Sequence, residues 1–163
     1  MTAVKLCTKR ARTRRRDGGF SYVELVIVVL ILGIMTVAAA PRMGDALQYH
    51  RVDSAADRIA FDLQLARNRA RMASAAHDVT FDSAGGSYTL TGVPDLDHPG
   101  QDYSVDLSAT PYHVLLTNVD FGGDQIVSFN GFGIPDSGGQ AELAAGSYTR
   151  TVVLDASGRV TVQ

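Results

Sequence analysis

The sequence has a single cysteine and no tryptophan in 163 residues. A lone cysteine, Cys7, excludes an intramolecular disulfide and gives no support to Cys-His catalysis. Basic residues are scarce late in the chain, because residues 77–163 hold two arginines, no lysine and eleven acidic residues. Residues 1–16 hold seven basic residues and no acid, so the formal net charge of -2 averages two very different ends. This charge asymmetry favours a membrane-inserted protein over a cytosolic enzyme.

Motifs with catalytic or metal-binding chemistry are also lacking. The sequence has no Walker loop, no nucleophile with an adjacent base and no catalytic carboxylate pair. Its four histidines do not have the paired spacing of metal ligands. Residues 95–102 are acidic, but Pro99 stands where an EF-hand needs a third ligand, and no closing glutamate follows. We therefore predict no enzyme activity, cofactor or metal site, and interpret residues 95–102 as a solvated acidic loop.

A long apolar run follows the basic start of the chain. Residues 25–40 carry no charge, and Thr36 is their only polar residue. Counted from Phe20, the run has about 21 residues, enough for a helix to cross a hydrocarbon core of about 30 Å. The preceding basic residues place the N-terminus in the cytoplasm and the rest of the chain outside. Residues 20–41 are therefore predicted to form a transmembrane helix.

Three interpretations account for this run. A cleaved secretory signal fits the basic start and the three alanines at 38–40. However, Glu24 interrupts its apolar part, and Pro41 would directly follow the cut. An uncleaved signal anchor fits the charge bias, but explains Glu24 only as a residue near the membrane interface. The third interpretation is a resemblance that explains the glutamate.

Residues 19–35 read G-F-S-Y-V-E-L-V-I-V-V-L-I-L-G-I-M. This stretch closely resembles the class III signal and N-terminal helix of type IV pilins and type II secretion pseudopilins. Gly19 matches the end of the basic leader, Phe20 the first residue of the mature chain, and Glu24 its fifth residue. Pro41 falls where these helices commonly carry a proline, and we expect a helix kink there.

The resemblance implies processing and assembly. A membrane-embedded prepilin peptidase would remove residues 1–19 by cutting between Gly19 and Phe20, and would then methylate the amino group of Phe20. The apolar helix would stay in the bacterial inner membrane and pack with other pilins or pseudopilins. A carboxylate in lipid needs a cation. In the family, the residue matching Glu24 aligns an incoming subunit with the N-terminus of its neighbour; pairing within its own chain is the alternative.

A helical period continues beyond the proline. Charged residues occupy other faces, and no strong helix breaker appears before residues 75–78. Residues 42–76 are therefore predicted to be the amphipathic half of one long helix. The apolar positions recur at three- and four-residue steps and are Val52, Ala56, Ile59, Leu63, Ala66, Ala70 and Ala73.

From residue 77 the pattern changes to short β-type runs separated by glycine-rich turns. Strands are predicted at 79–82, 87–91, 112–117, 126–130, 148–154 and 160–162. We expect residues 77–163 to form a β-rich periplasmic head, in which a small antiparallel sheet packs against residues 42–76. The predicted fold class is α+β, and the resemblance implies a type IV pilin-like fold.

The end of the chain resembles the minor pseudopilin H and FimT/FimU group. The relevant stretches are S-F-N-G-F-G-I-P-D-S-G-G and T-V-V-L-D-A-S-G-R-V-T-V. Generic turn glycines are the alternative explanation. The resemblance implies a minor pilin or pseudopilin at or near the tip of a type II secretion or type IV pilus filament. The residues that carry it are Phe129, Gly133, Gly158, Arg159 and Val160.

DNA binding is the alternative function, because some FimT-like proteins capture DNA. DNA affinity depends largely on lysine and arginine contacts with phosphates. Residues 20–163 hold eight basic and sixteen acidic residues, and the head offers only Arg150 and Arg159. Arg67, Arg69 and Arg71 are interpreted as solvated helix surface. We therefore do not expect nucleic acid to be a partner.

Overall fold

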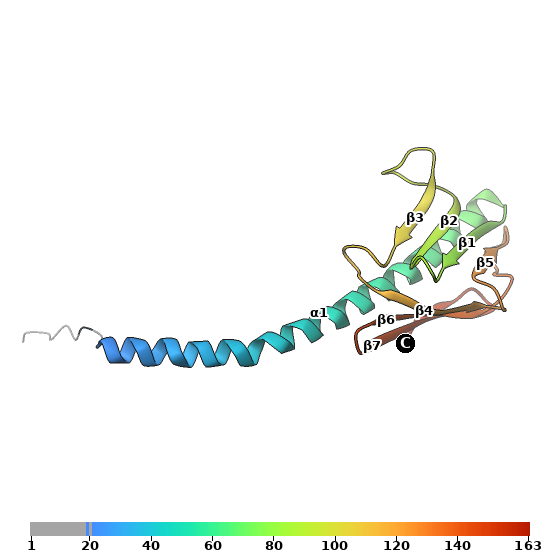
Figure 1. Ribbon diagram of the computed structural model, residues 1–163. Coiled ribbons are helices and arrows are strands. Elements are labelled where there is room, and N and C mark those ends of the chain that lie inside the picture. Colours follow the sequence, from blue (N-terminus) through green and yellow to red (C-terminus); the bar gives the residue numbers. More distant parts are fainter. Residues whose placement is uncertain (1–18, 20) are drawn as a thin grey trace, which may run out of the picture. The chain divides into compact units, whose positions relative to one another are not determined.

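The computed structural model describes residue 19 and residues 21–163, and for residues 37–43 it describes the backbone alone. In this part of the chain a long helix, α1 (Tyr22–Ala73), precedes all the strands (Figure 1). The chain divides into two units between Ala40 and Pro41, and each is considered by itself. Residues 1–18, with Cys7, and residue Phe20 lie outside the described residues. The Pro41 side chain does too, so the kink stays a prediction.

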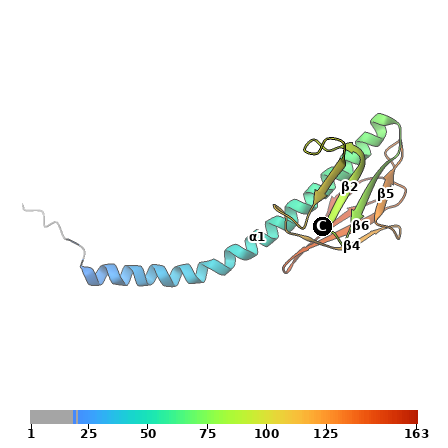
Figure 2. The ribbon, with the colours of Figure 1, turned by 45° about the horizontal axis from the view of Figure 1, so that its top comes forward.

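The second unit contains two antiparallel sheets of four strands each (Figure 2). Sheet A has the order β3-β2-β1-β5, and sheet B has the order β4-β6-β7-β8. The α+β prediction is confirmed, but the single small sheet is corrected to two. The strands are β1 (His77–Asp82), β2 (Ser87–Pro94), β3 (Asp102–Asp106), β4 (Leu115–Phe121), β5 (Ile126–Phe129), β6 (Gly139–Ala145), β7 (Tyr148–Leu154) and β8 (Val160–Val162).

Six observed strands overlap the predicted ones, and β1, β2, β4 and β5 differ from the prediction by one to four residues at one or both ends. The strand predicted at 112–117 begins at Leu115, because residues 110–112 form a turn and His113 has a positive φ of 50°. The strands β3 and β6 were not predicted at all. The last two predicted strands match β7 and β8 at both ends.

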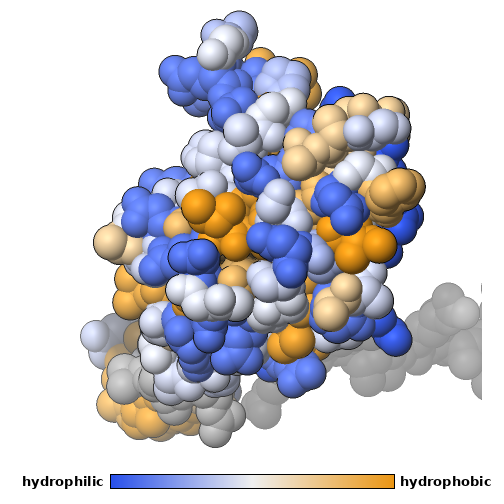
Figure 3. Space-filling view, turned by 90° about the vertical axis from the view of Figure 1, so that its right-hand side faces the viewer, coloured by the Kyte–Doolittle hydropathy of each residue, from blue (hydrophilic) through white to orange (hydrophobic). Residues whose placement is uncertain are grey.

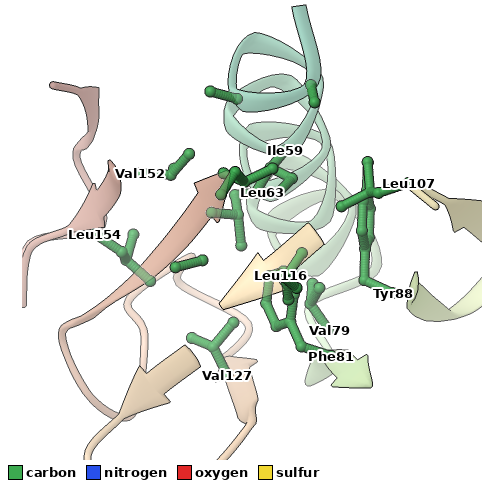
Figure 4. Close-up of a cluster of buried hydrophobic side chains, with 14 of the residues drawn as sticks. Ile59, Leu63, Val79, Phe81, Tyr88, Leu107, Leu116, Val127, Val152 and Leu154 are labelled. Carbon is green, nitrogen blue, oxygen red and sulfur yellow. The ribbon is translucent and has the colours of Figure 1, made fainter. Parts of the chain in front are cut away.

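One face of α1 forms the core with both sheets. Side chains of the two sheets surround Ile59 and Leu63 (Figure 4). Six of the seven predicted helix positions are buried, and Ala55 joins them. The prediction for Ala73 was wrong, because this residue is exposed at the end of the helix. The buried face of the helix consists of Val52, Ala55, Ala56, Ile59, Leu63, Ala66 and Ala70.

The helix ends in a left-handed turn. Ser74 has φ of 50°, and the Ala75 amide donates to the Ala70 carbonyl at 3.2 Å, as in a Schellman-type cap. Gly131 lies against this cap, because a Cβ on it would stand 2.7 Å from the Ser74 carbonyl carbon. The turn therefore fixes both the start of β1 and the position of the loop after β5.

Candidate functional site

The first half of α1 presents apolar side chains to its surroundings. Between Tyr22 and Met35 every large hydrophobic side chain is exposed, and the least exposed, Val26, still has 45% of its surface accessible. A helix that is apolar all round normally lies in a core or in a membrane. In the part of the chain that the structure describes, no helix is both long and apolar enough to span a membrane.

Of the predicted processing and assembly residues, the structure describes Gly19 and Glu24 but not Phe20. Glu24 is exposed in the first turn of α1, where a carboxylate interacts favourably with the helix dipole. Within the described residues it makes no salt bridge. Gly19 is exposed, and a Cβ built on it would meet no atom within 4 Å. The roles of Gly19, Phe20 and Glu24 stay predictions.

Arg67 of α1 joins two loops that are far apart in the sequence. Its Nε donates to the Gly133 carbonyl at 3.0 Å, and its two terminal nitrogens donate to the carbonyls of Gly158 at 2.8 Å and Ser157 at 3.1 Å. One guanidinium thus ties the loop after β5 and the β7–β8 turn to the helix. We call these the Arg67-bound loops, residues 130–134 and 155–159.

Glycine is needed at the points of contact in both loops. Gly133 has φ of 72°, and a Cβ there would stand 2.4 Å from Nε of Arg71. Gly158 has φ of 80°, and a Cβ there would stand 3.1 Å from Nε of Arg67. Both positions therefore combine a left-handed backbone with a close approach to an arginine.

The structure brings the predicted C-terminal motif partly together. Gly133 and Gly158 meet at Arg67, whereas Phe129 lies in the core on β5. Val160 begins β8 and pairs with Leu154. Arg159 is exposed. These positions explain how the residues build the head, while their role as a family motif stays a prediction.

The interpretation of the helix arginines as solvated surface is corrected for two of them. Arg67 and Arg71 each donate to loop carbonyls, Arg71 to that of Phe132 at 2.9 Å. Arg69 is exposed. The acceptors are backbone carbonyls, which every residue has, so the loop sequences do not identify their arginine partners. The i, i+4 spacing of Arg67 and Arg71 was the one available signal that they share a face.

A buried carboxylate ties the helix to sheet A. Asp62 is only 5% exposed, and its Oδ2 accepts hydrogen bonds from Oη of Tyr88 at 2.6 Å, Nε of Arg58 at 3.1 Å and Oη of Tyr103 at 3.2 Å. Burial raises the pKa of Tyr88, so its phenol remains a donor. Sequence periodicity placed Asp62 on a face away from the core. Its burial could not be predicted from the local sequence, because its tyrosine partners are 26 and 41 residues away.

A second arginine cluster ties the helix to sheet B. Nε of Arg150 on β7 donates to Asp53 at 3.0 Å, and its terminal nitrogen donates to Oη of Tyr49 at 2.9 Å. The guanidinium carbon also lies 5.1 Å from the centre of the Tyr49 ring. The hydrogen bond with Asp53 raises the pKa of Arg150, so this arginine stays charged.

The acidic loop at 95–102 uses two of its carboxylates internally. Asp95 accepts a hydrogen bond from the Asp97 amide at 2.9 Å, and its other oxygen lies 2.9 Å from Nδ1 of His98. Asp102 accepts from the Gly92 amide at 2.9 Å. Among the described residues, no three His, Cys, Asp or Glu side chains gather as a metal site would require.

A helix packed against antiparallel sheets, with an apolar extension, defines the class of type IV pilin-like proteins. The family model for Type II transport protein GspH matches residues 55–158, and the chain belongs to this family. The resemblance seen in the sequence is thereby confirmed. No curated protein matches the chain.

Two solved structures have the same fold. Both are of the type IV minor pilin FimU from Pseudomonas aeruginosa, at 15% identity. In space group P21 the match covers 70% of this chain and 89% of that one, with a TM-score of 0.53. In space group P65 the shares are 68% and 91%, with a TM-score of 0.50. The type IV pilin-like fold is therefore confirmed.

Proposed function

We propose that the chain is a structural subunit, a minor pilin or pseudopilin, that joins a filament through the first half of α1. The observation that carries the proposal is the exposed apolar surface between Tyr22 and Met35, with Glu24 in its first turn. Large contiguous apolar surfaces that are exposed mark sites of contact with proteins or membranes. Membership of the GspH family supports the same role.

The proposal includes the processing predicted from the sequence. Prepilin peptidase removes the leader 1–19 by cutting between Gly19 and Phe20, and methylates Phe20. Residues 20–41 hold the subunit in the bacterial inner membrane, the rest of α1 up to Ala73 completes the helix, and the head, residues 77–163, faces the periplasm. The minor subunit stands at or near the tip of the filament. The basic residues before the cut support this orientation.

The filament is a type II secretion pseudopilus or a type IV pilus. The name of the family supports the first, and the fold shared with FimU supports the second. DNA capture, the alternative function, receives less support, because Arg150 already binds Asp53 and Tyr49. Of the two arginines in residues 77–163, this leaves Arg159 for contact with phosphates.

Substitution of Glu24 tests the proposal. We expect Glu24→Leu to be processed normally but to be lost from filaments sheared from the cells, because no carboxylate meets the N-terminus of the neighbouring subunit. Glu24→Asp should retain part of the incorporation, and Glu142→Gln, which removes a carboxylate from the head, should retain all of it. Immunoblots of sheared and membrane fractions give the measurement. Normal incorporation of Glu24→Leu would contradict the assembly role.

A further inference from the structure

One segment of sheet A contributes no buried side chain to the head. It comprises residues 94–106, that is, the last residue of β2, the loop that follows and β3, and we call it the arm. Its most enclosed side chains, Asp95, Tyr103 and Val105, are only partly buried. The loop of the arm projects as a largely hydrophilic segment at the top of Figure 3. Segments with few buried apolar contacts open at a lower free energy than a core does.

Both ends of the arm are anchored in the core. Val93 before it is 6% exposed, and Leu107 after it is fully buried. The ladder between β2 and β3 shifts register between Leu90 and Pro94, and Gly92 within this stretch has a φ of 76°. The regular strand is therefore interrupted next to one end of the arm, so the arm can move while its two anchors stay in place.

The arm is held to the head by its pairing with β2 and by one side chain. β3 is the last strand of sheet A and has a strand neighbour on one side only. Among the described residues, Tyr103 is the one arm residue whose side chain is hydrogen bonded to α1. Its Oη donates to Oδ2 of Asp62 at 3.2 Å and accepts from Nη2 of Arg58. The guanidinium carbon of Arg58 also lies 5.7 Å from the centre of the Tyr103 ring.

Release of Tyr103 leaves no buried charge without a partner. Asp62 keeps Oη of Tyr88 at 2.6 Å and Nε of Arg58 at 3.1 Å. An unpaired buried carboxylate would make release costly, and these two donors prevent that. The side chain of Arg58 is 45% exposed, so water can solvate its guanidinium when Tyr103 leaves. The contact at Tyr103 can therefore open and re-form while the rest of the cluster stays paired.

The closed arm forms one wall of a groove in the head. The groove encloses about 390 Å³. Arm residues line it, among them Asp97, Tyr103 and Val105, and the facing side chains belong to Arg58 and to residues 109–112. Movement of the arm away from α1 would take this wall with it, so the groove depends on the position of the arm.

We propose that the arm opens and closes as one unit, that Tyr103 is its latch, and that the groove exists only while the arm is closed. A molecule that fills the groove then binds the closed state alone and stabilises it. The arm belongs to the head, so the proposal does not depend on leader cleavage or on the role of Glu24.

Hydrogen exchange of the full chain in detergent micelles, measured by mass spectrometry, tests the latch. Peptides from the arm should exchange faster than those from β1, which lies inside sheet A. Tyr103→Phe should raise the exchange rate of the arm about tenfold, because it removes a hydrogen bond to a charged group, and should leave β1 and β7 unchanged. Tyr112→Phe removes a hydroxyl from the same groove but leaves the link to α1 intact, so this matched control should change neither.

Three results would overturn the proposal. If the arm exchanges as slowly as β1, it does not open separately. If Tyr103→Phe accelerates exchange equally across the whole head, the arm opens only when the head unfolds. If Tyr103→Phe acts no differently from Tyr112→Phe, Tyr103 is not the latch.

A disulfide between β2 and β3 gives a second readout. Thr89 and Ser104 are directly paired, and their side-chain oxygens lie 3.4 Å apart, so cysteines at these positions are close enough to form a disulfide. In a Cys7→Ser background, the arm of oxidised Thr89→Cys/Ser104→Cys should exchange about tenfold more slowly than that of the reduced form. Tyr103→Phe should then have no effect. Equal exchange of the arm in both forms would show that opening does not separate β3 from β2, and would overturn the proposal.

Discussion

The two halves of α1 both carry apolar side chains, but the surroundings of these side chains differ. Leu30 in the first half is 60% exposed, whereas Leu63 in the second half is 1% exposed. The second half buries its apolar residues on one face against two sheets. The first half has apolar residues on every face, and the large ones are exposed between Tyr22 and Met35. One helix therefore contributes to the core of the head and also carries an exposed apolar surface.

Residue size explains part of this difference. The buried face of the second half contains Ala55, Ala56, Ala66 and Ala70, and these small side chains let the helix approach the sheets closely. Between residues 25 and 35 the chain has leucine, isoleucine and valine in place of alanine and charged residues. Such a segment suits a lipid or a bundle of like helices, where every face is covered.

The largest expected effect comes from shortening a leucine in each half. Leu63→Ala should lower the free energy of unfolding by about 3 kcal/mol, because it leaves a cavity in the core. Leu30→Ala should leave the unfolding of the head unchanged. Urea unfolding of the full chain in detergent, followed by the near-ultraviolet dichroism of its tyrosines, gives both values. Equal destabilisation by both variants would refute the contrast between the halves.

A smaller effect is expected from the arginines of the second half. Arg67→Ala should lower the free energy of unfolding by about 2 kcal/mol, because three loop carbonyls lose a charged donor. Arg69→Ala, two residues away and exposed, should change it by less than about 0.5 kcal/mol. The same urea measurement compares them. If the two variants behave alike, Arg67 does not hold the loops.

The smallest effect concerns pH and should be confined to the acidic loop, leaving both halves of α1 unchanged. The hydrogen bond with Asp95 raises the pKa of His98 above 6.5, and that with His98 lowers the pKa of Asp95 below 3.8. The stabilisation of the acidic loop by protonated His98 is therefore fully present below pH 6.5, and it is lost as pH rises through the raised pKa of His98. The stabilisation of the loop by ionised Asp95 is lost as pH falls through the lowered pKa of Asp95.

An NMR titration of the His98 ring measures this shift. In Asp95→Asn the pKa of His98 should return toward 6.5, because the carboxylate partner is gone. An identical midpoint in both proteins would show that the pair does not form in solution.

The sequence was most informative where local patterns decide the structure. The strands β7 and β8 were predicted at both ends, because the turn Asp155-Ala-Ser-Gly-Arg159 separates two β-branched runs. The buried helix face followed from its three- and four-residue steps. The N-terminal stretch predicted the family, which the GspH match confirms.

The missed features depend on contacts between distant residues. β6 consists of Gly139–Ala145, a segment rich in glycine, glutamine, alanine and glutamate that does not favour strands, and it forms because β4 and β7 pair with it on both sides. Asp62 is buried because tyrosines of β2 and β3 reach it. The local sequence of β6 does not reveal that β4 and β7 pair with it, and the local sequence around Asp62 does not reveal its tyrosine partners.

The intact mass of the mature protein, isolated from its own cells, tests the central claim most directly. The claim is that the first half of α1 is a retained assembly segment behind a removed leader. We predict a chain that begins with N-methylated Phe20. A chain that begins at Pro41 would indicate ordinary secretion, and a chain that keeps residues 1–19 would indicate a simple anchor; either result would contradict the account.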